Sequence, residues 1–121
     1  MPRDLASIGD MLEFAQNVLA FTEGLDEQGF GNDPVVQSAV LHQLTLLGEA
    51  VRRVSGPTRL AHPEVPWIRI SNLRNVVVHD YDDVRLPRIW MVVTRDIPAL
   101  IGVLAPIVAS RGVGGAGTES E

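Results

Sequence analysis

The densest group of side chains that could do chemistry lies between residues 73 and 83, and it contains Arg74, Asn75, His79 and Tyr81. Histidine is the side chain whose pKa lies closest to neutral, so it can accept or donate a proton during catalysis. Arginine can stabilise the negative charge that develops on a phosphorus centre in a transition state. These residue types suit RNA cleavage without a metal ion, in which the 2′-hydroxyl loses a proton and the leaving 5′-oxygen gains one.

The spacing of these residues leaves two interpretations open. On a helix, Asn75 and His79 share a face, whereas Arg74 and His79 diverge by about 140°. The latter two could meet because arginine is long, or across a symmetric dimer. Alternatively, Arg74 forms a salt bridge with an acid such as Asp80 or Glu49, and His79 caps the end of its helix. Spacing alone favours this structural interpretation, because single arginines and histidines are common.

The basic residues of the chain are all arginine. There are ten of them, with no lysine and no cysteine, which excludes lysine Schiff bases, disulfides, thiolate metal sites and a cysteine nucleophile. Arginine suits forked contacts with phosphate. The net charge of −5 nevertheless argues against a broad electrostatic footprint on nucleic acid. An RNA site would be a local positive pocket or would be shared between subunits, and Arg52 and Arg53 are either an exposed face or part of the RNA path.

The acidic segment Asp80–Asp83 is the one candidate for a metal site. Its carboxylates could bind Mg²⁺, but it lacks the glycine and the glutamate of a calcium-binding loop. A solvated acidic turn is the preferred interpretation. His42 and His62 have no metal-ligand spacing with His79, so both are assigned to structure. We therefore predict no metal and no cofactor.

The size and composition of the chain predict one soluble domain. It has 121 residues, of which 45% are apolar, enough for a single core. No apolar run is expected to be long enough to span a bilayer, and the segment Met1–Asp4 lacks the residue order of a signal peptide. We expect a cytoplasmic protein with one domain over residues 1–109 and a disordered, Gly-rich tail over residues 110–121.

Apolar residues at three- and four-residue steps predict four main helices. The expected helices are Asp4–Phe21, Asp33–Ser55, Pro66 to near His79, and a last helix from Pro87 onward. The segments Asp26–Asn32 and Thr58–Val65 are expected to be loops, and Pro98 should kink the last helix. This pattern predicts an all-α, antiparallel four- to five-helix up-and-down bundle, whose surplus apolar face would be covered by homodimerisation.

The order of these motifs resembles the HEPN superfamily, and most closely its HepT-like branch of toxin–antitoxin toxins. That branch carries an arginine, four residues, a histidine, any residue and a tyrosine, which here is Arg74 to Tyr81. The resemblance extends to about residue 108 and includes further segments: Arg3-Asp4, Phe21-Thr22-Glu23-Gly24, Leu47-Gly48-Glu49-Ala50, Pro63-Glu64-Val65-Pro66-Trp67, Ile89-Trp90 and Asp96-Ile97-Pro98. The Arg/His pattern by itself is common, whereas the ordered set is specific.

The resemblance implies a helical homodimer in which the Arg/His motifs of two subunits face one composite cleft. Active members of the branch are metal-independent ribonucleases. By matching position, Arg74 and His79 would be catalytic, with Asn75 as polar support. Glu49 would either orient Arg74 or face solvent.

The resemblance also implies a mode of silencing. Tyr81 corresponds to the tyrosine that a partner nucleotidyltransferase antitoxin modifies with AMP, and Asp80 and Asp82 could contact that antitoxin. A bulky anion beside an RNA cleft would both repel and block the substrate. The sequence thus predicts an endoribonuclease toxin that such a partner silences. The alternative is a non-catalytic HEPN binding module that partners a nucleotidyltransferase.

Overall fold

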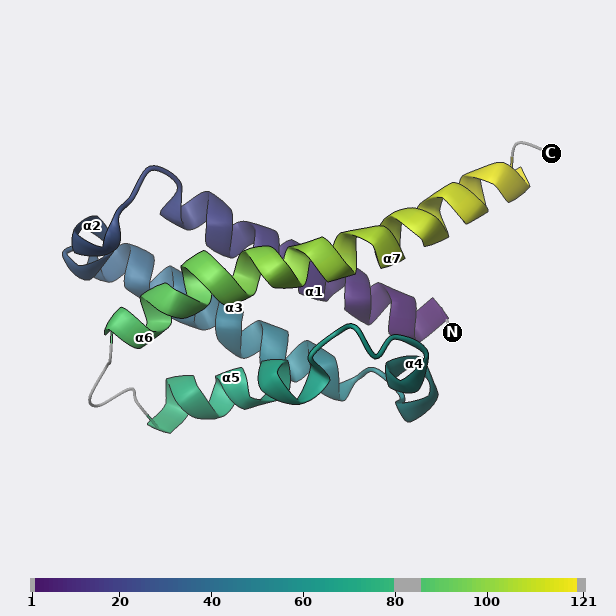
Figure 1. Cartoon of the computed structure of the whole chain (residues 1–121), viewed down its shortest axis with the longest axis horizontal. Coiled ribbons are helices and arrows are strands. Elements are labelled where there is room, and N and C mark those ends of the chain that lie inside the picture. The colour runs from purple at the N-terminus through teal and green to yellow at the C-terminus, as the bar shows by residue number, and fades with distance from the viewer. Residues whose placement is uncertain (1, 80–85, 120–121) are drawn as a thin grey trace.

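The computed structural model describes residues 2–79 and 86–119, and for residues 2, 74–79 and 111–119 it describes the backbone alone. Within these ranges the regular elements are all helices (Figure 1). They are α1 (Pro2–Thr22), α2 (Glu27–Gly31), α3 (Pro34–Arg52), α4 (Gly56–Ala61), α5 (Trp67–His79), α6 (Leu86–Met91), the π-helical segment η1 (Val92–Asp96) and α7 (Ile97–Glu119).

The long helices form an up-and-down bundle. Helix α1 packs against both α3 and α7, and α3 packs against α5. Successive long helices run in alternating directions, with α5 at the edge next to α3 and α7 crossing α1 (Figure 1). The predicted all-α antiparallel bundle is therefore confirmed, and homodimerisation stays a prediction.

The core is built from apolar side chains that recur at helical spacing on each long helix. Helix α1 ends near Gly24, whose φ of 79° lies in the left-handed region that favours glycine. Helix α3 begins at Asp33, whose Oδ1 accepts a hydrogen bond from the Val36 backbone N–H at 3.1 Å. The buried apolar side chains include Ile8, Met11, Ala15, Val18, Val40, Leu44, Leu47, Val51, Trp67, Ile70, Ile97, Leu100 and Leu104.

The predicted loop Asp26–Asn32 is wrong, because most of it forms helix α2. Asp26 caps this helix by accepting the Gly29 backbone N–H at 2.7 Å. Phe30 is only 1% exposed, and its ring centroid lies 5.2 Å from that of Trp90. A local cap and one buried aromatic anchor are sufficient to fold a helix of this length against the bundle.

The predicted loop Thr58–Val65 is wrong in its first part, which belongs to helix α4. Pro57, expected only to end the preceding helix, lies in the first turn of α4. Proline is tolerated there because a first-turn N–H has no partner within the helix. Gly56 and Pro57 therefore begin α4 rather than opening a loop, and residues 53–55 separate it from α3.

The irregularity predicted at Pro98 takes the form of the π-helical segment η1. The Ile97 backbone N–H donates to the Val92 carbonyl, five residues earlier, which is the hydrogen bond of a π-helix. In a regular α-helix the ring of Pro98 would clash with the carbonyl of Thr94. The wider turn before Pro98 relieves this clash and lets α7 continue in register with the core.

The last helical stretch is longer than the sequence predicted in two respects: the length of its apolar part and the point at which its backbone ends. The stretch Leu86–Ser110 is 25 residues long and contains an 18-residue window with a mean hydropathy of 1.7, so by length and composition alone it could cross a membrane. The expectation about length is therefore wrong, although a core helix passes the same test, and Leu100 and Leu104 of this stretch lie in the core. The backbone of α7 also continues to Glu119, past the start of the predicted disordered tail. The division into a domain (1–109) and a tail (110–121) stays a prediction.

Candidate functional site

Helix α5 carries the Arg/His motif and is anchored at its first residue. The indole N–H of Trp67 donates to the carbonyls of Arg59 at 3.1 Å and His62 at 3.0 Å. Trp67 and Ile70 are buried, and the Ile70 N–H bonds to the Pro66 carbonyl at 3.0 Å. The motif helix is thereby fixed to the end of α4 and to the residue that follows it.

The backbone of α5 places the two predicted catalytic positions on different sides of the helix. Position 74 follows Ile70 by four residues and Trp67 by seven, so it lies on the side of α5 that carries these buried residues. Position 79 follows Ile70 by nine residues, about half a turn away around the axis. One protomer therefore does not bring Arg74 and His79 to one face of α5, and Asn75 lies on the side of His79.

Glu49 lies on α3, the helix that packs against α5, and its side chain is half-buried. It has no hydrogen bond or ion pair with another described side chain. The two interpretations from the sequence, orientation of Arg74 or exposure to solvent, both stay open. Asp80, Tyr81 and Asp82 lie outside the described residues, so their roles stay predictions.

A cavity of about 220 Å³ lies between α5 and the stretch formed by η1 and α7. Two of its lining residues form an ion pair, with Nη2 of Arg69 3.1 Å from Oδ1 of Asp96. Leu73, which directly precedes Arg74, forms part of the wall. The remaining lining residues are mostly apolar: Glu64, Pro66, Ile70, Ile97, Ala99, Leu100 and Val103.

Sequence reasoning missed the ion pair at this cavity. Asp96 was noted only as part of the family resemblance, and its partner lies 27 residues earlier. Neither helical periodicity nor local motifs relate residues at such a separation. The proline that follows Ile97 is the only signal in the sequence, since it indicates an irregular turn at this place.

A second polar cluster, also missed, joins the start of α1 to the junction between α3 and α4. Asp4 is 4% exposed, and its carboxylate accepts hydrogen bonds from the Ser55 backbone N–H at 3.1 Å and from the Ser55 hydroxyl at 2.6 Å. The Thr58 hydroxyl donates to it at 2.5 Å. These hydrogen bonds hold the pKa of Asp4 below its ordinary value of 3.8. The Ser55 hydroxyl makes the largest contribution to this lowering, and the Thr58 hydroxyl makes the next largest.

The described side chains contain no group of three or more histidine, aspartate or glutamate residues that could hold a metal ion. The acidic segment Asp80–Asp83 lies outside the described ranges.

Comparison with known proteins gives a consistent result. Residues 11–107 match the family model described as "Ribonuclease HepT-like". The chain is 34% identical over 95 residues to "Putative RNase MJ1380" of Methanocaldococcus jannaschii, covering 78% of this chain and 87% of that protein. It is 31% identical over 93 residues to "Probable ribonuclease HepT" of Thermococcus cleftensis, covering 77% and 84% of the two chains. No solved structure matches the chain.

Proposed function

The chain belongs to the HepT-like ribonuclease family, and on that premise we propose that it is the metal-independent endoribonuclease toxin of a toxin–antitoxin pair. It is a ribonuclease, and its substrate is RNA. The observation that carries the finer proposal is the continuous helix α5, which holds the Arg/His motif inside the matched residues 11–107. We place its action in the cytoplasm, where an RNA-cleaving toxin meets its substrate.

We assign catalysis to Arg74 and His79. His79 accepts the proton of a ribose 2′-hydroxyl while that oxygen attacks the neighbouring phosphorus and the bond from phosphorus to the 5′-oxygen breaks. The leaving 5′-oxygen takes up a proton, so the products are a 2′,3′-cyclic phosphate and a free 5′-hydroxyl. Arg74 stabilises the extra negative charge on the phosphoryl oxygens in the transition state. The side-chain amide of Asn75 forms a hydrogen bond that orients either the His79 imidazole or a phosphate oxygen of the substrate.

The divergence of the two positions around α5 supports a cleft shared by two copies of the chain. Because they lie about 140° apart on one helix, a twofold axis beside α5 would let the arginine of one protomer meet the histidine of the other. The exposed apolar side chains Ile68 and Met91 supply surface that such an interface would cover. A homodimer is therefore part of the proposal.

Silencing is assigned to Tyr81, two residues after His79. A nucleotidyltransferase antitoxin would transfer AMP from ATP to its hydroxyl, with pyrophosphate as the leaving group and the phenolic proton lost. Asp80 and Asp82 would contact that partner. The added phosphate carries a negative charge beside the place where an RNA phosphate must bind, so charge repulsion and steric blockage act together.

The test compares two histidine substitutions in a cleavage assay that contains a metal chelator. His79→Ala should lower the rate of RNA cleavage by about 10²–10⁴, the usual contribution of a positioned acid or base. The matched control is His42→Ala, because His42 is an exposed histidine on α3 and should leave the rate unchanged. Cleavage at the full rate by His79→Ala would refute the assignment.

A growth assay separates the toxin from the non-catalytic binding module. Expression of the wild-type chain should arrest growth, and co-expression of the antitoxin should relieve it. Tyr81→Phe should stay toxic in the presence of the antitoxin's modifying activity. A harmless wild-type chain that still binds the nucleotidyltransferase would support the binding module instead.

A further inference from the structure

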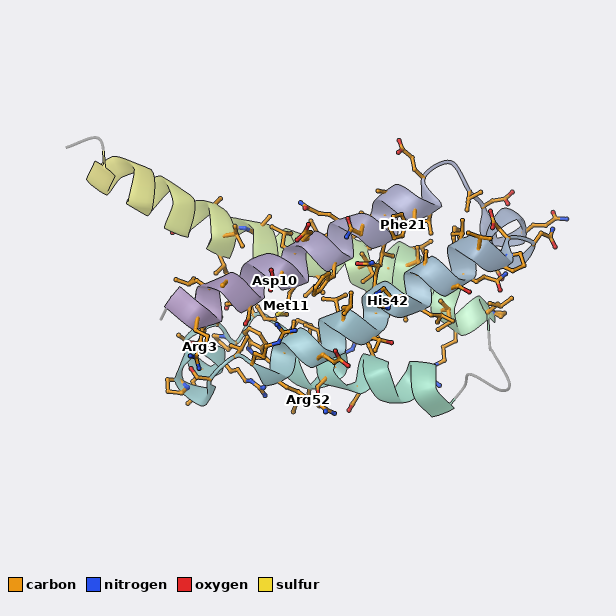
Figure 2. The ribbon with its side chains drawn as sticks, turned by 180° about the vertical axis from the view of Figure 1, so that it is seen from behind. Arg3, Asp10, Met11, Phe21, His42 and Arg52 are labelled. Atoms are coloured by element: carbon orange, nitrogen blue, oxygen red, sulfur yellow. The ribbon has the colours of Figure 1, made fainter. Side chains whose placement is uncertain are left out.

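Three exposed arginines gather where α1 begins and α3 ends. Arg3 lies in the first turn of α1, Arg52 is the last residue of α3, and Arg53 follows it. We call Arg3, Arg52 and Arg53 the arginine corner. The hydrogen bonds from Ser55 and Thr58 to Asp4 draw the start of α1 to this junction. In Figure 2, Arg3 lies beside α4, and Arg52 lies farther along the bundle near the end of α3.

Capping of α3 does not account for Arg52 and Arg53. The last carbonyls of a helix need donors, and a cation there interacts favourably with the helix dipole. In this chain Arg59 fills that role, since its Nη2 donates to the Val51 carbonyl at 2.6 Å and its Nε to the Val54 carbonyl at 3.1 Å. The end of α3 therefore has a cationic cap without the arginine corner.

Ion pairing does not account for the corner either. Within the described part of the chain, the ion pairs are His62–Glu64 and Arg69–Asp96, and neither includes a residue of the corner. Asp4, the nearest acid in sequence to Arg3, is buried and accepts its hydrogen bonds from Ser55 and Thr58. The three guanidinium groups are thus exposed without a described acidic partner.

The charge of the whole molecule makes this concentration of arginine informative. The chain carries fifteen acidic residues against ten arginines, for a net charge of −5. An anionic polymer is repelled by most of such a surface, so its binding depends on local groups of positive charge. Guanidinium groups match phosphate oxygens with paired N–H donors. The arginine corner is therefore suited to a nucleic-acid backbone.

The corner lies at the end of the bundle where the motif helix begins. The carbonyls of Arg59 and His62 accept the Trp67 indole N–H, which ties the end of α4 to the start of α5. Along α5, positions 74 and 79 lie roughly 10 Å and 18 Å beyond Trp67, at about 1.5 Å per residue. A single strand held at the motif can reach the corner with its adjoining nucleotides.

We propose that Arg3, Arg52 and Arg53 bind phosphates of the RNA strand several nucleotides away from the cleavage site. This inference rests on the proposed ribonuclease function and adds the surface that holds the substrate of an otherwise acidic enzyme. The contact is to the RNA backbone, so it strengthens binding of every sequence and selects none.

The test measures the salt dependence of RNA binding in a His79→Ala background, in which the RNA stays intact. The probe is a fluorescent single-stranded RNA oligonucleotide, and anisotropy gives the dissociation constant between about 50 and 200 mM salt. Arg52→Ala with Arg53→Ala removes two phosphate contacts, which should lower the slope of log K against log salt by about 1.4. Affinity at the lower salt concentration should fall by about tenfold or more.

Two matched variants distinguish local contacts from bulk charge. Arg52→Lys with Arg53→Lys keeps both charges and should keep the slope near that of the parent. Arg88→Ala with Arg95→Ala removes the same charge from exposed positions on α6 and η1 and should change the slope much less. An unchanged slope in the variant with Arg52→Ala and Arg53→Ala, or an equal fall in the variant with Arg88→Ala and Arg95→Ala, would overturn the proposal.

Cleavage by the chain with His79 intact is scored separately. If the binding experiment supports the corner but the chain with His79 intact never cleaves RNA, the proposed ribonuclease toxin is refuted and the RNA-binding role of the corner is retained. If the chain with His79 intact cleaves RNA but Arg52→Ala with Arg53→Ala leaves the salt slope of binding unchanged, only the RNA-binding role of the corner is refuted.

Discussion

Substitution of Trp67 by phenylalanine tests how the motif helix is held in place. The change removes the indole N–H that donates to the carbonyls of Arg59 and His62 at 3.1 and 3.0 Å. Loss of one such donor costs about 1 kcal/mol net. Trp67 is 8% exposed, and the smaller ring buries about 40 Å² less apolar surface, which costs about 1 kcal/mol more at 25 cal/mol per Å².

The expected loss is therefore about 2 kcal/mol in the free energy of unfolding, or roughly 6–10 °C in thermal midpoint for a domain of this size. Urea unfolding followed by circular dichroism at 222 nm measures it. Trp90→Phe is the matched control, because Trp90 is half-buried and its indole N–H has no hydrogen bond among the described residues. It should lose about 1 kcal/mol or less, from ring area alone.

The same substitution should also affect catalysis, because the start of α5 would be held less firmly. We expect a lower kcat with the RNA dissociation constant little changed, since Trp67 is buried in the core rather than at a surface that RNA could reach. If Trp67→Phe unfolds at the same urea concentration as Trp90→Phe, the two carbonyl hydrogen bonds do not anchor the motif helix.

Two further perturbations concern the polar clusters. The depressed pKa of Asp4 means that the contribution of its carboxylate to stability is present above the unfolded-state pKa, near 3.8, and is lost as pH falls through the lower folded-state pKa. Asp4→Asn should therefore have a lower urea midpoint of unfolding than the wild type at pH 7, and the difference between the two midpoints should shrink below about pH 4. A difference between the midpoints that grows on acidification would contradict the hydrogen-bond account. The exposed pair Arg69–Asp96, with side chains 74% and 44% exposed, should show a coupling energy of only about 0.2–1 kcal/mol in a double-mutant cycle, weakened by added salt; a coupling well above that range would mean that the pair is shielded from water.

The long helices were predictable from the sequence because each buries one stripe of apolar side chains. Ile8, Met11, Ala15 and Val18 show the three- and four-residue steps that only a helix brings to one face. Asp33 followed by proline marks the start of α3 in the sequence as it does in the structure. Local chemistry and periodicity therefore suffice for the bundle.

The short helices and the polar clusters depend on partners far away in the chain. Phe30 anchors α2 through Trp90, sixty residues later. Asp4 organises the start of α4 from 51 residues away. Such contacts follow from the packing of the bundle, and a single sequence without the fold gives no spacing rule for them.

The candidate site was predictable only in part, for a similar reason. The helix that carries Arg74 and His79, and the separation of the two positions around it, follow from α-helical geometry. The cavity beside Leu73, the Arg69–Asp96 pair and the arginine corner depend on how separate helices meet. Spacing along one segment therefore predicts which residues could act, and tertiary packing determines what lies beside them.

The central claim is that Arg74 and His79, brought together in a cleft shared by two copies of the chain, cleave RNA through the ribose 2′-hydroxyl without a metal ion. The most direct measurement compares two substrates in the presence of a metal chelator: an RNA that the enzyme cuts at one position, and the same RNA with a single 2′-deoxynucleotide 5′ to that bond. The account predicts that the first is cut to a 2′,3′-cyclic phosphate and that the second is not cut there. Cleavage of the 2′-deoxy substrate at that bond, or cleavage of RNA only when Mg²⁺ is supplied, would contradict it.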